Sequence, residues 1–218
     1  MRKISSVLRQ DWLIISLILL GFAIGAYFYP LLPDKVPIHW NFQGEINGYG
    51  SKWFGAFGLP LINLALYIML FVLPYIDPKR KSYADFQSTY QFIKHLLIVF
   101  FLGIEVFSLL LATGAVVNQP MFIQIMISLL FILLGNVMGR VKHNYFVGIK
   151  TPWTLASEEV WRKTHRLAAP LWVIGGIVNI LLTALGTSFN GIGFGIIVAI
   201  ITIVPTVYSY IAYQKIVK

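Results

Sequence analysis

The chain has 218 residues, of which 58% are hydrophobic and 11% are charged, and its mean hydropathy is +0.77. A soluble domain carries about 25% charged residues. This composition therefore excludes a soluble protein, because a surface this apolar must face lipid. The chain contains no cysteine, which excludes disulfides and thiolate metal sites.

Six apolar runs are long enough to cross a bilayer, since a helical span needs about 20 apolar residues. Backbone polar groups in lipid must be satisfied within each span, and the alternation typical of barrel strands is missing from the runs. We therefore expect an all-α integral membrane protein with six transmembrane helices, at residues 12–29, 54–76, 96–117, 121–138, 167–185 and 192–213. The first run is too long for a signal-peptide core and lacks a clear A-x-A site, so we expect it to be retained.

Basic residues are distributed unevenly among the segments outside these runs. The N-terminus, the second and fourth connectors and the C-terminal tail hold 15 of the 17 Lys and Arg residues, and only Lys35 and Lys52 lie in the first connector. The positive-inside rule then predicts cytoplasmic termini in a multi-pass membrane protein. The formal charge of +9 indicates anchoring to anionic lipid rather than direct binding of nucleic acid.

The first connector, residues 31–53, is expected on the outer side. A connector of this length is usually functional or disordered, and its aromatic residues argue against disorder. A structural cap is one alternative. A metal site with His39, Asp34 and Glu45 is another, but no repeated ligand spacing supports it, so we expect no metal. The candidate ligand-binding residues of the first connector are His39, Trp40, Asn41 and Gly44.

Glu105 lies near the middle of the third apolar run. An ionisable side chain at this depth costs about 2–3 kcal/mol or more, which makes it a hypothesis of function. The alternative is a protonated glutamate that forms a hydrogen bond between helices. The candidate polar partners by residue type are Asn63, Gln124, Asn136 and Asn179.

The fourth connector, residues 140–166, collects polar, aromatic and charged side chains between two apolar runs. Ser157 is a plausible N-cap, and Glu158 and Glu159 follow it in the first turn, where the helix dipole favours carboxylates. We therefore predict that residues 158–166 form a short amphipathic helix at the inner leaflet, followed by a bend at Pro170. The alternative to a partner-binding role is a simple anchor at the membrane surface.

The segment NYFVGIKTPWTL resembles the signature of the SdpI family of bacterial immunity proteins, with lysine where the family commonly has arginine. A Val-Trp pair and a His-Arg pair follow it, and Gly135-Asn136 precedes it, as in that family. The residues that carry the resemblance in the fourth connector are Asn144, Gly148, Lys150, Thr151, Pro152, Trp153, Thr154, Trp161, His165 and Arg166.

The first connector resembles a second pattern, P-x-x-I/V-P-x-H-W-N-x-x-G. This pattern marks a membrane domain of unknown function that often precedes the SdpI segment. The two resemblances divide the sequence into an N-terminal part, residues 1–117, and a C-terminal part, residues 118–218.

The resemblance implies a multi-pass protein of the bacterial cytoplasmic (inner) membrane. Such a protein gives resistance to a secreted peptide toxin and can hold a winged-helix transcriptional repressor at the cytoplasmic face. We expect the protein to act by binding these partners. The sequence shows no known catalytic motif and no cofactor-binding motif. We therefore expect no enzyme activity and no cofactor. The alternative is a small transporter or proton-coupled carrier that uses Glu105. The sequence does not identify a toxin or an oligomeric state.

Overall fold

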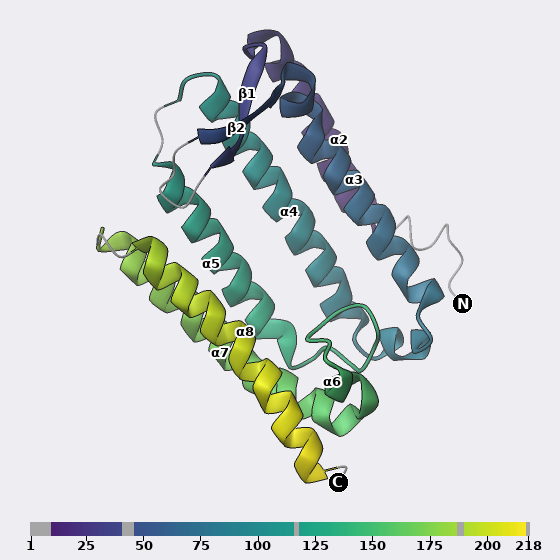
Figure 1. The fold of residues 1–218 in the computed structure, drawn as a ribbon. Helices are drawn as coiled ribbons and strands as arrows, with labels where there is room; N and C mark the ends of the chain where they lie inside the picture. Colours follow the sequence, from purple (N-terminus) through teal and green to yellow (C-terminus); the bar gives the residue numbers. More distant parts are fainter. Residues whose placement is uncertain (1–9, 41–45, 116–117, 187–189, 217–218) are drawn as a thin grey trace. The chain divides into compact units, whose positions relative to one another are not determined.

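The structure is a computed structural model that describes residues 10–40, 46–115, 118–186 and 190–216. In these residues, six helices are long and apolar enough to cross a membrane, as the sequence predicts. The helices, labelled in Figure 1, are α2 (Trp12–Phe28), α3 (Lys52–Ile76), α4 (Gln87–Ala112), α5 (Gln119–Met138), α7 (Glu158–Ala184) and α8 (Asn190–Ile216).

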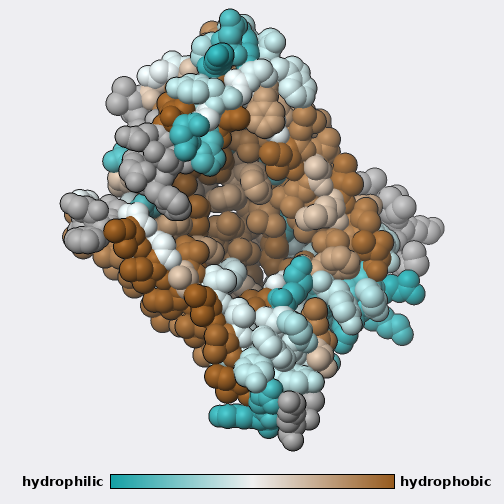
Figure 2. All heavy atoms as spheres, in the orientation of Figure 1, coloured by the Kyte–Doolittle hydropathy of each residue, from teal (hydrophilic) through white to brown (hydrophobic). Residues whose placement is uncertain are grey.

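Helix α8 shows why the protein needs a lipid environment. Figure 2 shows hydrophobic side chains along most of its length and polar ones near its C-terminal end. Ile192, Ile203 and Val207 are each at least half exposed. Apolar surface of this extent is stable only against lipid or another apolar surface.

Two helix boundaries differ from those expected from hydropathy. Helix α4 begins at Gln87, so Lys94, which the charge distribution assigns to a connector, lies inside the helix and is buried. Helix α7 runs without a break from Glu158 to Ala184 through Pro170. The segment 158–166 is therefore the first part of α7 and not a separate helix. Pro170 removes one helical hydrogen bond, but α7 continues past it.

The first connector contains a β-hairpin that the sequence pattern does not predict. Strand β1 (Lys35–Trp40) pairs antiparallel with β2 (Ile46–Ser51), with irregular register around His39. The strands are short, and the proline and glycines within them obscure the alternation that normally identifies a strand. Val36 is buried and fills the space over Gly55 at the start of α3, which fixes the hairpin to that helix.

Three short helical turns complete the described elements. They are η1 (Tyr29–Leu31), η2 (Arg80–Ala84) and α6 (Pro152–Ala156). Turn η1 ends α2, whereas η2 and α6 lie in the second and fourth connectors.

The chain forms two compact units that interleave along the sequence. The first comprises Met1–Phe71 and Lys94–Pro120, and the second comprises Val72–Ile93 and Met121–Lys218. The division of the sequence into residues 1–117 and 118–218 remains a prediction about its motifs.

Two apolar clusters of described residues lie along the helices of the first unit. One is centred on Ile14, Ile18, Tyr67 and Ile98, and the other on Leu32, Val36, Ala56 and Leu109. In the second unit, α7 and α8 lie side by side (Figure 1), and the Trp172 indole donates to the carbonyl of Ile201, 3.0 Å away.

Candidate functional site

The fourth connector is organised around the buried indole of Trp161. Its N–H donates to the carbonyl of Val141 at 2.9 Å. The ring stacks on His165, with centroids 4.1 Å apart and planes inclined by 22°. The ring of His143 also lies near the indole, at a centroid distance of 5.2 Å and an interplanar angle of 34°. Trp161 therefore holds the beginning of the connector against α7.

His165 is fixed in one tautomer by two backbone contacts. The backbone N–H of Ile149 donates to its Nε2 at 2.9 Å, so Nδ1 carries the proton and donates to the carbonyl of Trp161 at 2.8 Å. A buried imidazole with one donor and one acceptor used in this way is neutral. His165 thus joins the connector to the first part of α7.

Gly148 allows the connector to approach these two rings. Its φ of +128° lies in the region that favours glycine. A Cβ at this position would lie 2.5 Å from Nε2 of His165 and 2.9 Å from Trp161. The family glycine is therefore required both by backbone conformation and by space.

Asn144 folds the segment before Gly148 into a tight turn. Its Oδ1 accepts from the backbone N–H groups of Phe146 and Val147, and its Nδ2 donates to the carbonyls of Lys142 and Val147. The amide is fully buried. No other side chain of similar size has both the acceptor and the donors that this turn uses.

Thr151, Pro152 and Thr154 begin helix α6 with a capping box. The Thr151 hydroxyl accepts from the backbone of Thr154, and the Thr154 hydroxyl accepts from the backbone of Thr151. Proline suits the first helical position because its missing N–H would have no helical partner there. The Thr151 hydroxyl also lies 2.9 Å from that of Ser209, which joins the motif to α8.

Asp77 joins the second connector to the fourth. Its carboxylate accepts from the Tyr83 hydroxyl, the backbone N–H of Lys79 and the backbone N–H of Tyr145. Burial, followed by the hydrogen bond to Asp77, raises the pKa of Tyr83 above its ordinary value. Tyr83 therefore remains a neutral hydrogen-bond donor. Sequence reasoning misses the link to the fourth connector because Tyr145 is 68 residues from Asp77 in the chain.

His143 makes a second link between the same connectors. The Lys79 ammonium donates to its Nδ1 at 2.8 Å, and its Nε2 donates to the carbonyl of Leu155 at 3.1 Å. Burial, followed by the positive charge of Lys79, lowers the pKa of His143 below its ordinary 6.5. The imidazole is therefore neutral at physiological pH.

The family residues of the fourth connector divide into two groups by exposure. Lys150, Pro152 and Arg166 are exposed, and Trp153 is half-buried with its ring centroid 5.0 Å from that of Tyr210. The members whose side chains are buried within the chain are Asn144, Thr151, Thr154, Trp161 and His165. The exposed group is the part available to a partner, while the buried group gives the connector its shape.

The hairpin of the first connector presents an exposed surface. Nδ1 of His39 donates to Oδ1 of Asn47 on the opposite strand, and Ile38 and Tyr49 are exposed. Of the predicted ligand-binding residues, Asn41, Gly44 and the side chain of Trp40 lie outside the described residues. Among the side chains that the structure places, no group of three His, Asp or Glu residues could hold a metal ion.

The two predicted intramembrane polar residues have different surroundings. Glu105 is fully buried in α4, whereas Asn136 is exposed on α5. Two of the residues considered as partners of Glu105 form hydrogen bonds between α5 and α7. The Thr183 hydroxyl donates to Oε1 of Gln124 at 2.9 Å, and Nδ2 of Asn179 donates to the Ser128 hydroxyl at 2.6 Å.

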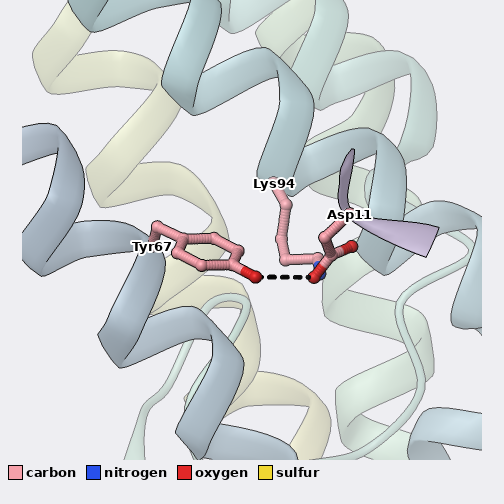
Figure 3. A network of polar contacts seen from close by, with 3 residues as sticks. All are labelled: Asp11, Tyr67 and Lys94. Carbon is pink, nitrogen blue, oxygen red and sulfur yellow. Dashed lines mark hydrogen bonds and ion pairs between the residues drawn. The ribbon is translucent and has the colours of Figure 1, made fainter. Parts of the chain in front are cut away.

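A buried ion pair in the first unit is missed by sequence reasoning. Lys94 and Asp11 lie 2.6 Å apart, and the Tyr67 hydroxyl donates to the same carboxylate oxygen at 3.3 Å (Figure 3). The three residues come from α4, the residue before α2, and α3. The one feature of the sequence that could have indicated this ion pair is Asp11, an acidic residue directly before the first apolar run.

The comparisons with known proteins agree with the two motifs. Residues 140–209 match the SdpI/YfhL protein family, and residues 16–64 match a domain of unknown function, DUF1648. The chain is similar to Immunity protein SdpI of Bacillus subtilis (strain 168), with 24% identity over 208 residues, 95% of this chain and 98% of that protein. No solved structure matches. The matches to both motifs, together with a relative that spans nearly the whole chain, confirm the resemblance to the SdpI/YfhL protein family and indicate a multi-pass bacterial membrane protein.

Proposed function

We propose that this protein is a membrane immunity protein that protects its cell from a secreted peptide toxin. The observation that carries the proposal is the similarity to Immunity protein SdpI over 95% of this chain and 98% of that relative. A shared function is more plausible when the likeness includes both connectors and all six spans than when it covers one motif. The proposed mechanism is binding rather than catalysis.

The proposal places both termini in the cytoplasm and the hairpin outside. The basic residues of the two termini and of the second and fourth connectors support this orientation, because positively charged segments are retained on the cytoplasmic side. The hairpin then faces the medium from which a toxin arrives.

The proposed toxin-binding surface is the hairpin of the first connector. Its support is the exposure of Ile38, Ile46 and Tyr49, which offer apolar contacts beside the polar His39. A two-stranded sheet also has strand edges to which an extended peptide can add by backbone hydrogen bonds. The residues that the sequence predicts to bind the toxin on this surface are His39, Trp40, Asn41 and Gly44.

The proposed partner surface on the opposite side is the exposed part of the fourth connector. Lys150 and Arg166 offer positive charge, and Pro152 and the half-buried Trp153 lie in the same motif. We infer that a winged-helix repressor is the partner held there, following the family resemblance. Signalling across the membrane then requires that toxin binds two conformations of the protein with different affinity.

The test is expression of this chain in a toxin-sensitive bacterium, followed by challenge with candidate peptide toxins. We expect survival with the intact chain and loss of protection with His39→Ala. Asn47→Ala is the matched variant, because it removes the same hydrogen bond but keeps the imidazole. Protection that is lost only with His39→Ala indicates contact with the toxin, whereas equal loss in both indicates a role in hairpin structure.

Failure of the intact, membrane-inserted chain to protect against any peptide toxin would contradict the proposal. The competing function, a small proton-coupled carrier, predicts instead solute uptake or efflux that depends on Glu105. Flux measured in vesicles with the intact chain and with Glu105→Gln separates the two.

A further inference from the structure

The polar groups buried in the first unit are arranged at three levels along its helices. At one end, Asp11, Tyr67 and Lys94 meet (Figure 3). One turn further along α4, the side chain of Asn63 donates to the carbonyl of Ile98 at 3.1 Å. Two turns beyond that lies Glu105, about 16 Å of helix from Lys94.

At the first level, the opposite charges of Lys94 and Asp11 neutralise each other. The Lys94 ammonium and the Asp11 carboxylate form an ion pair, and the Tyr67 hydroxyl adds a hydrogen bond to the same oxygen. Lys94 is therefore engaged elsewhere and three turns away, so it does not compensate a charge on Glu105. Among the described residues of this unit, Asp11, Tyr67 and Lys94 are the other buried titratable groups.

Glu105 has no such partner among the described residues. Its side chain is fully buried, and none of the side chains or backbone groups that the structure describes forms a hydrogen bond with either carboxylate oxygen. The carboxyl group lies against Gly21 of α2, where an added Cβ would be 2.8 Å from Oε2. A glycine at this position thus makes room for the carboxyl group between the two helices.

Apolar side chains close the site on both sides. On α4, Ile98 precedes Glu105 and belongs to the cluster with Ile14 and Ile18, while Leu109 follows Glu105 and belongs to the cluster with Leu32 and Ala56. Water is therefore excluded in both directions along the helices. An ionised carboxylate without a partner in such a place carries a large desolvation cost, and the usual outcome is that the group takes up a proton.

The chemistry of the site favours a proton over a metal cation. Hard cations take six or more oxygen ligands, whereas Glu105 supplies only two oxygens. The next buried unpaired oxygen on this face, Oδ1 of Asn63, belongs to the level two turns away. A single cation therefore cannot be coordinated by Glu105 and Asn63 together.

We propose that Glu105 is an occluded proton-binding site, held as a neutral carboxylic acid between the two apolar clusters. Its proton leaves only in a state in which one of the clusters has opened to water. Any conformational change that exposes Glu105 is thereby linked to proton release, and lower pH favours the closed state. This inference is independent of the proposed immunity function.

The experiment is infrared spectroscopy of the full-length protein in lipid at neutral pH, comparing the intact chain with Glu105→Gln. Glutamine is neutral and similar in shape, so the fold is retained. We expect the carbonyl band of a protonated carboxylic acid in the intact chain and its loss in the variant. Glu159→Gln is the matched control, since that exposed carboxylate forms an ion pair with Lys163 and its replacement leaves the band unchanged.

Exchange of the proton tests the occlusion. After transfer to deuterium oxide, the band of the intact chain shifts slowly, and Ile18→Ser, which opens one cluster, accelerates the shift about tenfold or more. Two results would overturn the proposal. One is equal spectra of the intact chain and Glu105→Gln at neutral pH. The other is a band that appears only when sodium is removed, because sodium would then be the ligand.

Discussion

The indole of Trp161 and the imidazole of His165 lie in parallel contact, with ring centroids 4.1 Å apart. Both residues are on the first part of α7, one turn apart, and both hold the fourth connector through hydrogen bonds to its backbone. The family motif is therefore a packing unit in which a short helical face organises a long connector.

Removal of the indole N–H should weaken this unit. Trp161→Phe leaves the carbonyl of Val141 without its donor, and a buried group that loses its partner costs about 1–3 kcal/mol. Thermal unfolding in detergent should show a lower midpoint for Trp161→Phe than for the intact chain. Trp153→Phe is the control, because that ring is half-buried, and an equal loss of stability in both variants would contradict the assignment.

Replacement of Gly148 tests whether the backbone conformation of the fourth connector requires glycine at this position. Gly148→Ala combines an unfavourable φ with a clash against His165, and strain of this kind costs about 1–3 kcal/mol or more. Gly139→Ala is matched to it, because a Cβ there meets nothing within 4 Å. We expect reduced folded yield and a lower unfolding midpoint for Gly148→Ala alone. A midpoint equal to that of Gly139→Ala would show that the connector adapts freely.

The link made by Asp77 should control the opening of the fourth connector. Hydrogen bonds to a charged group contribute about 1.5–3 kcal/mol each, so Asp77→Ala should speed hydrogen exchange around Tyr145 about tenfold or more. Asp85→Ala removes an exposed carboxylate of the same connector and should leave the exchange unchanged. Equal exchange rates in the two variants would contradict the role of Asp77.

Acid should loosen the same connector through His143. The pKa of His143 is lower in the folded protein than its ordinary 6.5, so the unfolded chain binds the proton more readily. The stability from neutral His143 is therefore complete above about pH 6.5 and is lost as the pH falls below it. Unfolding midpoints measured across this range should decline toward acid, and His143→Gln should reduce the slope. A slope that His143→Gln leaves unaltered would contradict this account.

Much of the fold could be predicted from the sequence because it depends on local properties. Six apolar runs specify six helices, and Ser157 is the N-cap of α7 as its position before two glutamates predicts. Hydropathy could not place the start of α4, since Lys94 is tolerated there only because Asp11 neutralises it, and no local pattern reveals a pair of residues so distant in the chain.

The candidate site was predicted in part. The motif residues are identifiable from their resemblance to the family, but resemblance does not separate exposed Lys150 from buried Asn144, because exposure depends on the path of the whole connector. The links through Asp77 and His143 also escape sequence reasoning, since they join connectors separated by two spans. The hairpin is missed because its alternation is interrupted by glycine and proline.

The proposed division between a toxin-facing hairpin and a partner-facing connector requires that these surfaces lie on opposite sides of the membrane. The most direct measurement is labelling of single-cysteine variants with a membrane-impermeant thiol reagent, which is unambiguous because the chain has no cysteine of its own. Asn47→Cys reports on the hairpin and Arg162→Cys on the beginning of α7, and both positions are exposed. We expect Asn47→Cys to react in intact cells and Arg162→Cys to react only after the cells are permeabilised. Reaction of both in intact cells, or of Arg162→Cys alone, would contradict the account.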